Sequence, residues 1–121
     1  KALKDHTFVF SHFKYTDKTG EDGDVDAKVA RIEEMDAALP ALRDAGPDVL
    51  VITGDHSTPP SIRAHSWHPV PVLMKAPYLR GKDADRFTEF TCRHGQIGSI
   101  YSKELLPLAM AHAGKLQKYG A

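Results

Sequence analysis

An aspartate and a histidine stand side by side directly after an apolar stretch. They are Asp55 and His56, in the segment TGDHSTP that begins at Thr53. A carboxylate and an imidazole on one tight turn can hold one divalent metal ion or two neighbouring ones, and Gly54 lets the backbone turn sharply before them. A further histidine, His65, follows in the segment HSWHPVPV. This region is therefore a candidate metal site.

Two further candidate ligands come earlier, in the polar, glycine-rich stretch over 14–24, which predicts a loop. They are the carboxylates of Asp17 and Glu21. With the imidazoles they form a mixed N/O set, which suits Mn²⁺ or Zn²⁺ better than Ca²⁺. Each feature also has an ordinary structural explanation. An Asp-His pair after a strand is commonly a turn with a satisfied imidazole, and an acidic loop is commonly solvated surface.

The pattern of apolar residues predicts an α/β fold. Branched and aromatic residues predict a buried strand over 7–13, and an almost wholly apolar run predicts a second strand over 48–53. Between them the spacing predicts an amphipathic helix that Asp24 caps and that Pro40 kinks or ends. Gly46-Pro47 is a firm stop for this helix. A third strand is predicted over 70–75.

Two more helices are predicted after the third strand. One is short, over 83–93, and the other is capped by Ser102, tolerates Pro107 and runs to about Lys118. The first two strands enclose a helix and should be parallel, whereas the helix-free connection to the third strand favours an antiparallel pairing. The loops that carry the candidate ligands would then meet at one edge of the sheet, where α/β proteins bind ligands.

Composition narrows the classes of function. The chain has 121 residues, of which 41% are hydrophobic and 26% charged, as in one globular domain that buries a core. Its 16 basic residues balance 16 acidic ones, so charge gives no reason to expect nucleic acid or a membrane as partner. The single cysteine, Cys92, favours a reducing, cytoplasmic setting. A start at Lys1 without a methionine suggests a piece of a longer protein.

These motifs resemble those of a known enzyme family. TGDHSTP followed by HSxxPVPV is similar to the metal-binding region of archaeal-type, cofactor-independent (2,3-bisphosphoglycerate-independent) phosphoglycerate mutases, members of the alkaline phosphatase superfamily. FVFSHFKYTDKTGEDGD resembles the family's preceding block, and HGQIGSIYSKELLPLAM resembles its closing block. The resemblance implies a single domain over 1–121 that is the C-terminal portion of such an enzyme. Its fold would be a partial alkaline-phosphatase-like sheet flanked by helices.

The resemblance also implies roles for the candidate ligands. Asp55 and His56 match the pair that ligates the metal which activates the nucleophile, and Asp17 and His65 match ligands of a second metal. Glu21 stands where the family usually has a histidine, so it either ligates through oxygen or marks a degraded site. The cofactors would be two divalent ions, Mn, Zn or Mg, and 2,3-bisphosphoglycerate is not needed.

The implied reaction interconverts 3-phosphoglycerate and 2-phosphoglycerate through a phosphoserine. Lys14 would contact the substrate, and His12 also matches the family pattern. The family's serine nucleophile lies in N-terminal segments that nothing here resembles, so no catalytic residue is assigned and the chain alone should be inactive. The alternatives are another phosphohydrolase of the superfamily and a non-catalytic metal-binding or interaction module. An open sheet edge predicts a homodimer.

Overall fold

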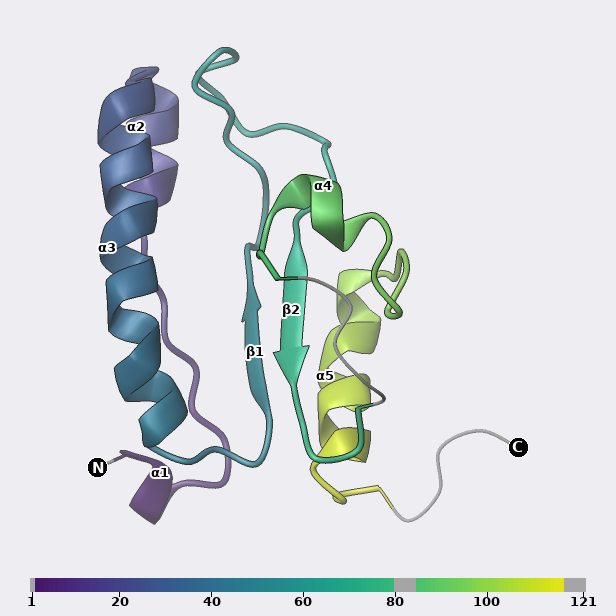
Figure 1. The fold of residues 1–121 in the computed structure, drawn as a ribbon. Coiled ribbons are helices and arrows are strands. Elements are labelled where there is room, and N and C mark those ends of the chain that lie inside the picture. The colour runs from purple at the N-terminus through teal and green to yellow at the C-terminus, as the bar shows by residue number, and fades with distance from the viewer. Residues whose placement is uncertain (1, 80–84, 117–121) are drawn as a thin grey trace. The chain divides into compact units, whose positions relative to one another are not determined.

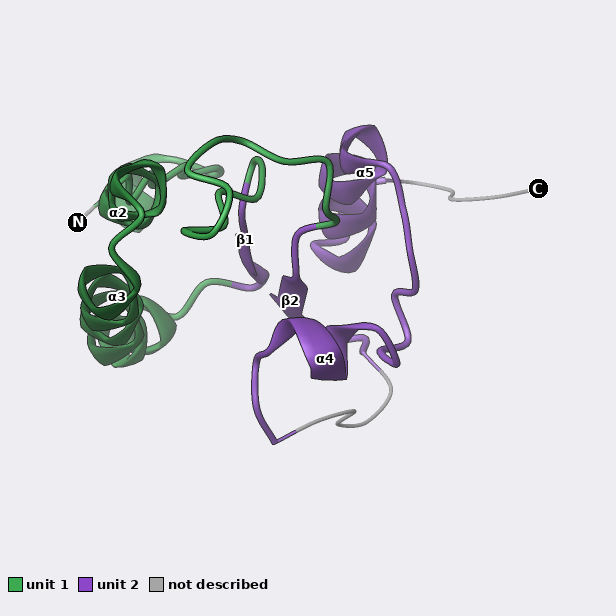
Figure 2. Cartoon of the chain, turned by 90° about the horizontal axis from the view of Figure 1, so that it is seen from above, with its two compact units in different colours: residues 1–47, 55–69 green, residues 48–54, 70–121 purple. Residues whose placement is uncertain are grey.

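The computed structural model describes residues 2–79 and 85–116. Within them the chain forms two compact units, one from 2–47 with 55–69 and the other from 48–54 with 70–79 and 85–116 (Figure 2). The elements follow one another in the order α1 (Ala2–Asp5), α2 (Tyr15–Asp22), α3 (Val25–Asp44), β1 (Leu50–Thr53), β2 (Val72–Lys75), α4 (Glu89–Cys92) and α5 (Ser102–His112) (Figure 1).

The acidic stretch that was predicted as a loop is largely the helix α2. Its residue types have low helix propensity, but packing overrides propensity: Gly20 is buried in the helix, and a Cβ there would overlap the Thr58 carbonyl oxygen. The helix ends at Gly23, whose φ of 74° is the left-handed conformation in which glycine carries no steric cost. The correction matters for the site, because Asp17 and Glu21 are one helical turn apart and share a face.

Helix α3 begins as predicted and ends at Asp44, just before the predicted stop at Gly46-Pro47. The backbone N–H of Ala27 donates to Asp24 Oδ1 at 2.9 Å, so the predicted cap is confirmed. Pro40 lies inside the helix and does not end it. A proline removes only one backbone donor, so the helix can continue for one more turn after it. Gly46, which follows the helix, has a φ of 72°. Figures 1 and 2 show α2 and α3 side by side in the first unit.

The predicted first strand is not formed. Among the described residues the sheet has two strands, β1 and β2. They pair antiparallel, as predicted for these two segments, with Leu50 opposite Lys75 and Thr53 opposite Val72. The segment 7–13 has no strand assignment, because a strand exists only where a neighbouring strand completes its hydrogen bonds. The predicted parallel pair is therefore not observed in the part of the chain that the structure describes.

The helices of the second unit are shorter than predicted. α4 covers only the end of the stretch 83–93, whose first two residues lie outside the described part. At α5 the cap position is Tyr101, so Ser102 is the first helical residue, and Pro107 is tolerated inside the helix. Gly114 follows α5 with a φ of 66°, and the last residues of the predicted helix, 117–118, are not described.

The described residues contain no buried hydrophobic side chain, so the expected core is not formed. The only side chain in them that counts as buried is polar, that of Thr58, which is 4% exposed. Along α3, residues that the pattern assigned to a core face are open to solvent, among them Val25, Val29 and Ile32, which are 59%, 48% and 51% exposed. Over residues 2–79 and 85–116, no helix combines the length and apolarity needed to cross a membrane.

Candidate metal centre

The first unit contains all five predicted metal ligands. Helix α2 presents the carboxylates of Asp17 and Glu21, and the segment that follows β1 presents the remaining three ligands. A backbone bridge closes that segment into a loop, since the N–H of Ser66 donates to the Ser57 carbonyl oxygen at 2.8 Å. The bridge brings His65, the neighbour of Ser66, back towards the start of the loop.

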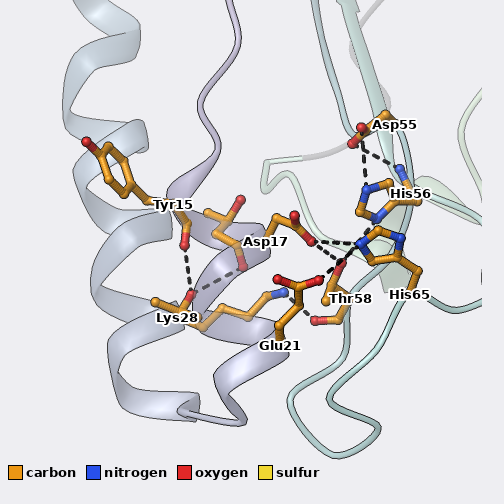
Figure 3. A network of polar contacts seen from close by, with 10 residues as sticks. Tyr15, Asp17, Glu21, Lys28, Asp55, His56, Thr58 and His65 are labelled. Atoms are coloured by element: carbon orange, nitrogen blue, oxygen red, sulfur yellow. Dashed lines mark hydrogen bonds and ion pairs between the residues drawn. The ribbon is translucent and has the colours of Figure 1, made fainter.

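Three of the predicted ligands form one cluster. Asp17, His56 and His65 each offer one ligand atom, and these atoms all lie within 4.8 Å of one another. The two imidazole rings are stacked, with centroids 3.7 Å apart and an angle of 29° between the planes. His65 Nε2 lies 3.5 Å from Asp17 Oδ1 and 3.5 Å from Glu21 Oε1, so Glu21 adjoins the cluster (Figure 3).

Asp55 stands beside this cluster rather than in it. Its side chain is 74% exposed, and its Oδ2 lies 3.5 Å from His56 Nε2. Its other oxygen accepts a hydrogen bond from the His56 backbone N–H at 3.1 Å, which fixes the carboxylate next to the imidazole (Figure 3). His56 thus has the Asp55 carboxylate on its Nε2 side and belongs to the cluster with Asp17 and His65 as well.

Thr58 also contacts the cluster, although the sequence motifs did not single it out. Its hydroxyl donates to Asp17 Oδ1 at 2.7 Å and lies 3.1 Å from His56 Nδ1. The ammonium of Lys28 on α3 donates to the Thr58 carbonyl oxygen at 2.6 Å. The sequence signal for Thr58 was its place two residues after His56 in the TGDHSTP motif, whereas nothing in the sequence pointed to Lys28.

The carboxyl group of Asp17 has a lowered pKa. The hydrogen bond from Thr58 is the largest cause, and His56 and His65, when protonated, and Lys14 act electrostatically in the same direction. Burial opposes them but does not prevail. The carboxylate is therefore ionised at neutral pH, as a metal ligand must be.

Lys14, the predicted substrate contact, and His12, which also matches the family pattern, are placed differently. Lys14 is exposed at the start of α2, and its charge acts on Asp17. His12 is exposed, its ring centroid lies 6.4 Å from that of Phe10, and it is not in the cluster of three ligands. The structure thus associates Lys14 electrostatically with the ligands, whereas His12 packs against an aromatic neighbour.

The donor set fits a divalent transition-metal ion. It combines two imidazole nitrogens with an ionised carboxylate, and two more carboxylates adjoin it. Such mixed sets hold Zn²⁺ and Mn²⁺ in proteins, whereas Ca²⁺ is bound by oxygen alone. Ligands must converge in this way to bind the same ion or two neighbouring ions, and scattered acidic side chains on a surface would not be close enough.

Known proteins are similar to this chain in sequence and in fold. The family described as "Metalloenzyme superfamily" matches residues 1–112. A protein of Thermus thermophilus named "Probable 2,3-bisphosphoglycerate-independent phosphoglycerate mutase" is 55% identical over 100% of this chain and 31% of its own length. A protein of the same name from Thermotoga maritima is 50% identical over the same shares. The family resemblance of the motifs is thus confirmed.

A solved structure, "Structure of PH0037 protein from Pyrococcus horikoshii", matches with a TM-score of 0.91 at 38% identity. It covers 98% of this chain and 37% of that chain. The chain therefore spans well under half the length of the proteins that it matches. That it corresponds to the C-terminal portion of such a protein stays a prediction.

Proposed function

Because the chain belongs to the metalloenzyme superfamily, we propose that it is the metal-binding part of a 2,3-bisphosphoglycerate-independent phosphoglycerate mutase. The observation that carries the proposal is the convergence of Asp17, His56 and His65 within 4.8 Å. The 55% identity to the Thermus protein supports this activity among those of the superfamily. The complete enzyme would interconvert 3-phosphoglycerate and 2-phosphoglycerate in cytoplasmic glycolysis, through a phosphoserine.

Two divalent ions would share the ligands of the first unit. Asp55 and His56 would hold one ion, and Asp17, His65 and Glu21 the other, as the paired distances of 3.5 Å suggest. When bound, such ions neutralise charge on a transferring phosphoryl group and lower the pKa of the attacking hydroxyl. The ionised carboxylates supply negative charge, and the imidazoles supply lone pairs that are available only when the rings are neutral.

The remaining parts of the reaction require residues that this chain does not offer. Ser57 and Ser66 form the backbone bridge that closes the loop, and the Ser66 hydroxyl lies 2.8 Å from His68 Nδ1. The family's serine nucleophile belongs to segments that nothing in this chain resembles. We assign no catalytic nucleophile here, and we expect no mutase turnover from the 121-residue chain alone. Lys14 would contact a carboxylate or phosphate of the phosphoglycerate substrate. No nucleic acid or membrane partner is proposed.

Calorimetric titration of Mn²⁺ and then Zn²⁺ into the chain tests the proposal. Two ions should bind to the wild type. Asp55→Ala and His56→Ala should each lose one of the two binding events, and Glu21→Ala should weaken the other. Asp22→Ala is the matched control, because Asp22 is an exposed carboxylate on the same helix and should bind like the wild type. Absence of binding in the wild-type chain would contradict the proposed metal site.

Two other functions have a specific observation in their favour. The family match is to a whole superfamily of metalloenzymes, which is compatible with a different phosphohydrolase. Phosphatase activity without mutase activity in the longer protein would favour it. The many exposed apolar side chains fit a non-catalytic interaction module. A chain that self-associates but has no affinity for Mn²⁺ or Zn²⁺ would favour that function.

A further inference from the structure

The hydroxyl of Thr58 joins residues from both proposed metal-binding pairs. It contacts Asp17 of one pair at 2.7 Å and His56 of the other at 3.1 Å. The side chain is 4% exposed, so water does not readily replace either partner. A buried polar group with two such partners fixes the position of both.

The hydrogen bonds of this hydroxyl define where the protons lie. A threonine hydroxyl has one proton, and an ionised carboxylate can only accept. The proton of Thr58 is therefore donated to Asp17 Oδ1, so the Thr58 oxygen accepts the N–H of His56 Nδ1. A neutral imidazole has one N–H, so the lone pair of His56 is on Nε2.

His56 Nε2 is also the nitrogen that adjoins Asp55. Its distance to Asp55 Oδ2 is 3.5 Å, so a nitrogen lone pair and a carboxylate lie next to each other (Figure 3). Metal-ligating histidines generally donate their other ring N–H to a neighbouring group, which fixes the tautomer and the ring orientation. Thr58 occupies the position of that neighbouring group.

Two residues of the helices hold Thr58 in place. Lys28 Nζ on α3 donates to its carbonyl oxygen at 2.6 Å. On α2, Gly20 lets the same carbonyl approach the helix backbone, because a Cβ there would overlap it. Thr58 is thus fixed against both helices through its backbone, while its hydroxyl is directed at the ligands.

We propose that Thr58 is a positioning residue of the metal centre, which holds His56 as the Nδ1–H tautomer and orients Asp17. His56 then ligates through Nε2, beside Asp55, and one hydroxyl couples the two metal-binding pairs. The inference rests on the proposed function for its metal, whereas the tautomer is a property of the metal-free chain. Thr58 itself contacts neither substrate nor metal in this proposal.

The test compares Thr58→Val, which keeps the shape and removes the hydroxyl, with Thr58→Ser, which keeps the hydroxyl. Two-dimensional ¹H–¹⁵N NMR of the metal-free chain at a pH where His56 is neutral identifies the protonated ring nitrogen. The wild type and Thr58→Ser should carry the proton on Nδ1, and Thr58→Val should lose this preference. Titration with Mn²⁺ should show an affinity about 10- to 100-fold lower in Thr58→Val and close to wild type in Thr58→Ser.

Thr19→Val is the matched control. Its hydroxyl on α2 donates to the backbone carbonyl oxygens of Tyr15 and Thr16, not to a ligand. A wild-type His56 protonated on Nε2 would overturn the inference, even if Thr58→Val did not fold. An unchanged tautomer and Mn²⁺ affinity in a folded Thr58→Val would overturn it as well. A wild-type chain with the Nδ1–H tautomer that binds no Mn²⁺ would refute the proposed function but support the role of Thr58 in setting the tautomer.

Discussion

Glu21 is the residue at which this chain departs from the motif pattern that it otherwise resembles. Its Oε1 lies 3.5 Å from His65 Nε2, close enough for both atoms to serve one ion. An oxygen ligand favours harder ions such as Mn²⁺, whereas an imidazole favours Zn²⁺. Glu21→His should therefore shift the ratio of Zn²⁺ to Mn²⁺ affinity towards Zn²⁺, and Glu21→Ala should weaken both. Competition titrations of the two ions measure the ratio.

The exposed neighbour Asp22 is again the control, as Asp22→His adds an imidazole on the same helix away from His65. An equal shift in Asp22→His would show that any added histidine attracts Zn²⁺. An unchanged ratio in Glu21→His would show that position 21 does not ligate.

The pKa of Asp17 gives a second prediction at the residue scale. It is lowered from the ordinary value of 3.8, chiefly by the Thr58 hydroxyl. A lowered pKa in the folded state stabilises the protein above the ordinary value, and this contribution is lost as pH falls through the folded pKa. Thr58→Val should raise the Asp17 pKa, as NMR of the carboxyl carbon would show. Thr58→Val should also lower the free energy of unfolding by about 1–3 kcal/mol at neutral pH. This loss of stability should be smaller in strong acid.

Thr19→Val should leave the Asp17 carboxyl titration unchanged, since the Thr19 hydroxyl donates to the backbone carbonyl oxygens of Tyr15 and Thr16 in its own helix. If Thr58→Val lost the same unfolding free energy at neutral and at strongly acidic pH, the loss would come from altered packing. It would then not depend on the ionisation of Asp17.

The candidate ligands could be picked out from the sequence, whereas the residues that contact them could not. Asp55 and His56 are adjacent in the chain, so a short motif shows that they act together. The contact between Asp17 and Thr58 joins residues 41 positions apart, and that between Lys28 and Thr58 joins residues 30 positions apart. Such contacts depend on how helices pack against a loop, which no local pattern encodes.

At the scale of elements, the approach of α2 to the metal-binding loop depends on Gly20. An alanine usually stabilises a helix by about 1 kcal/mol relative to glycine. Here a Cβ would overlap the Thr58 carbonyl oxygen and lie 2.9 Å from Lys28 Nζ, so the loop must move away from the helix. Gly20→Ala should therefore lower the unfolding free energy by roughly 1–3 kcal/mol and weaken Mn²⁺ binding. Thermal unfolding and calorimetry measure the two effects.

Gly95→Ala is the control for this substitution, because a Cβ there would meet only the Cys92 carbonyl oxygen at an ordinary 3.4 Å. If Gly20→Ala stabilised the chain as a usual helical alanine does, the close packing of α2 on the loop would be wrong.

The start of α3 gives a second prediction for an element. The Asp24 carboxylate accepts the N–H of Ala27 at 2.9 Å, and Lys28 follows in the next turn. Asp24→Ala should cost about 1 kcal/mol of stability and fray the turn that carries Lys28. Urea unfolding measures the cost, with Asp36→Ala in the middle of the same helix as control. Equal stability of the two variants would mean that the cap is not formed in solution.

Secondary-structure elements were predicted best where interactions between residues close in sequence determine them. The Asp24 cap and the antiparallel pairing of β1 and β2 follow from local chemistry and a short connection. Two elements needed longer-range information. Polar and glycine residues in α2 suggested a loop, but the contact with Thr58 makes the helix favourable. Branched and aromatic residues over 7–13 suggested a strand, but β structure also requires a partner.

At the scale of the whole chain, composition predicted a buried core, but none is present in the described residues. The apolar residues exist in ordinary proportion, 41% of the sequence, yet many of the large ones remain exposed. Composition counts apolar side chains and does not show which surfaces cover them. Exposed apolar area of this kind is unfavourable in water and stabilises any complex that removes it from solvent.

The segment 7–13 has large apolar side chains that are exposed to solvent. Phe8 and Phe10 are 65% and 78% exposed on a β-prone segment with no strand partner in the described residues. Such segments associate through backbone pairing and apolar contact. We expect the apparent mass of the chain in sedimentation velocity to rise with concentration, consistent with the predicted homodimer. The double variant Phe8→Ser, Phe10→Ser should reduce this association. Phe90→Ser, at a phenylalanine that is 72% exposed on α4, should leave it intact. A wild-type chain that stays monomeric at high concentration would show that these apolar side chains do not drive self-association, and an equal effect of Phe90→Ser would place the association elsewhere.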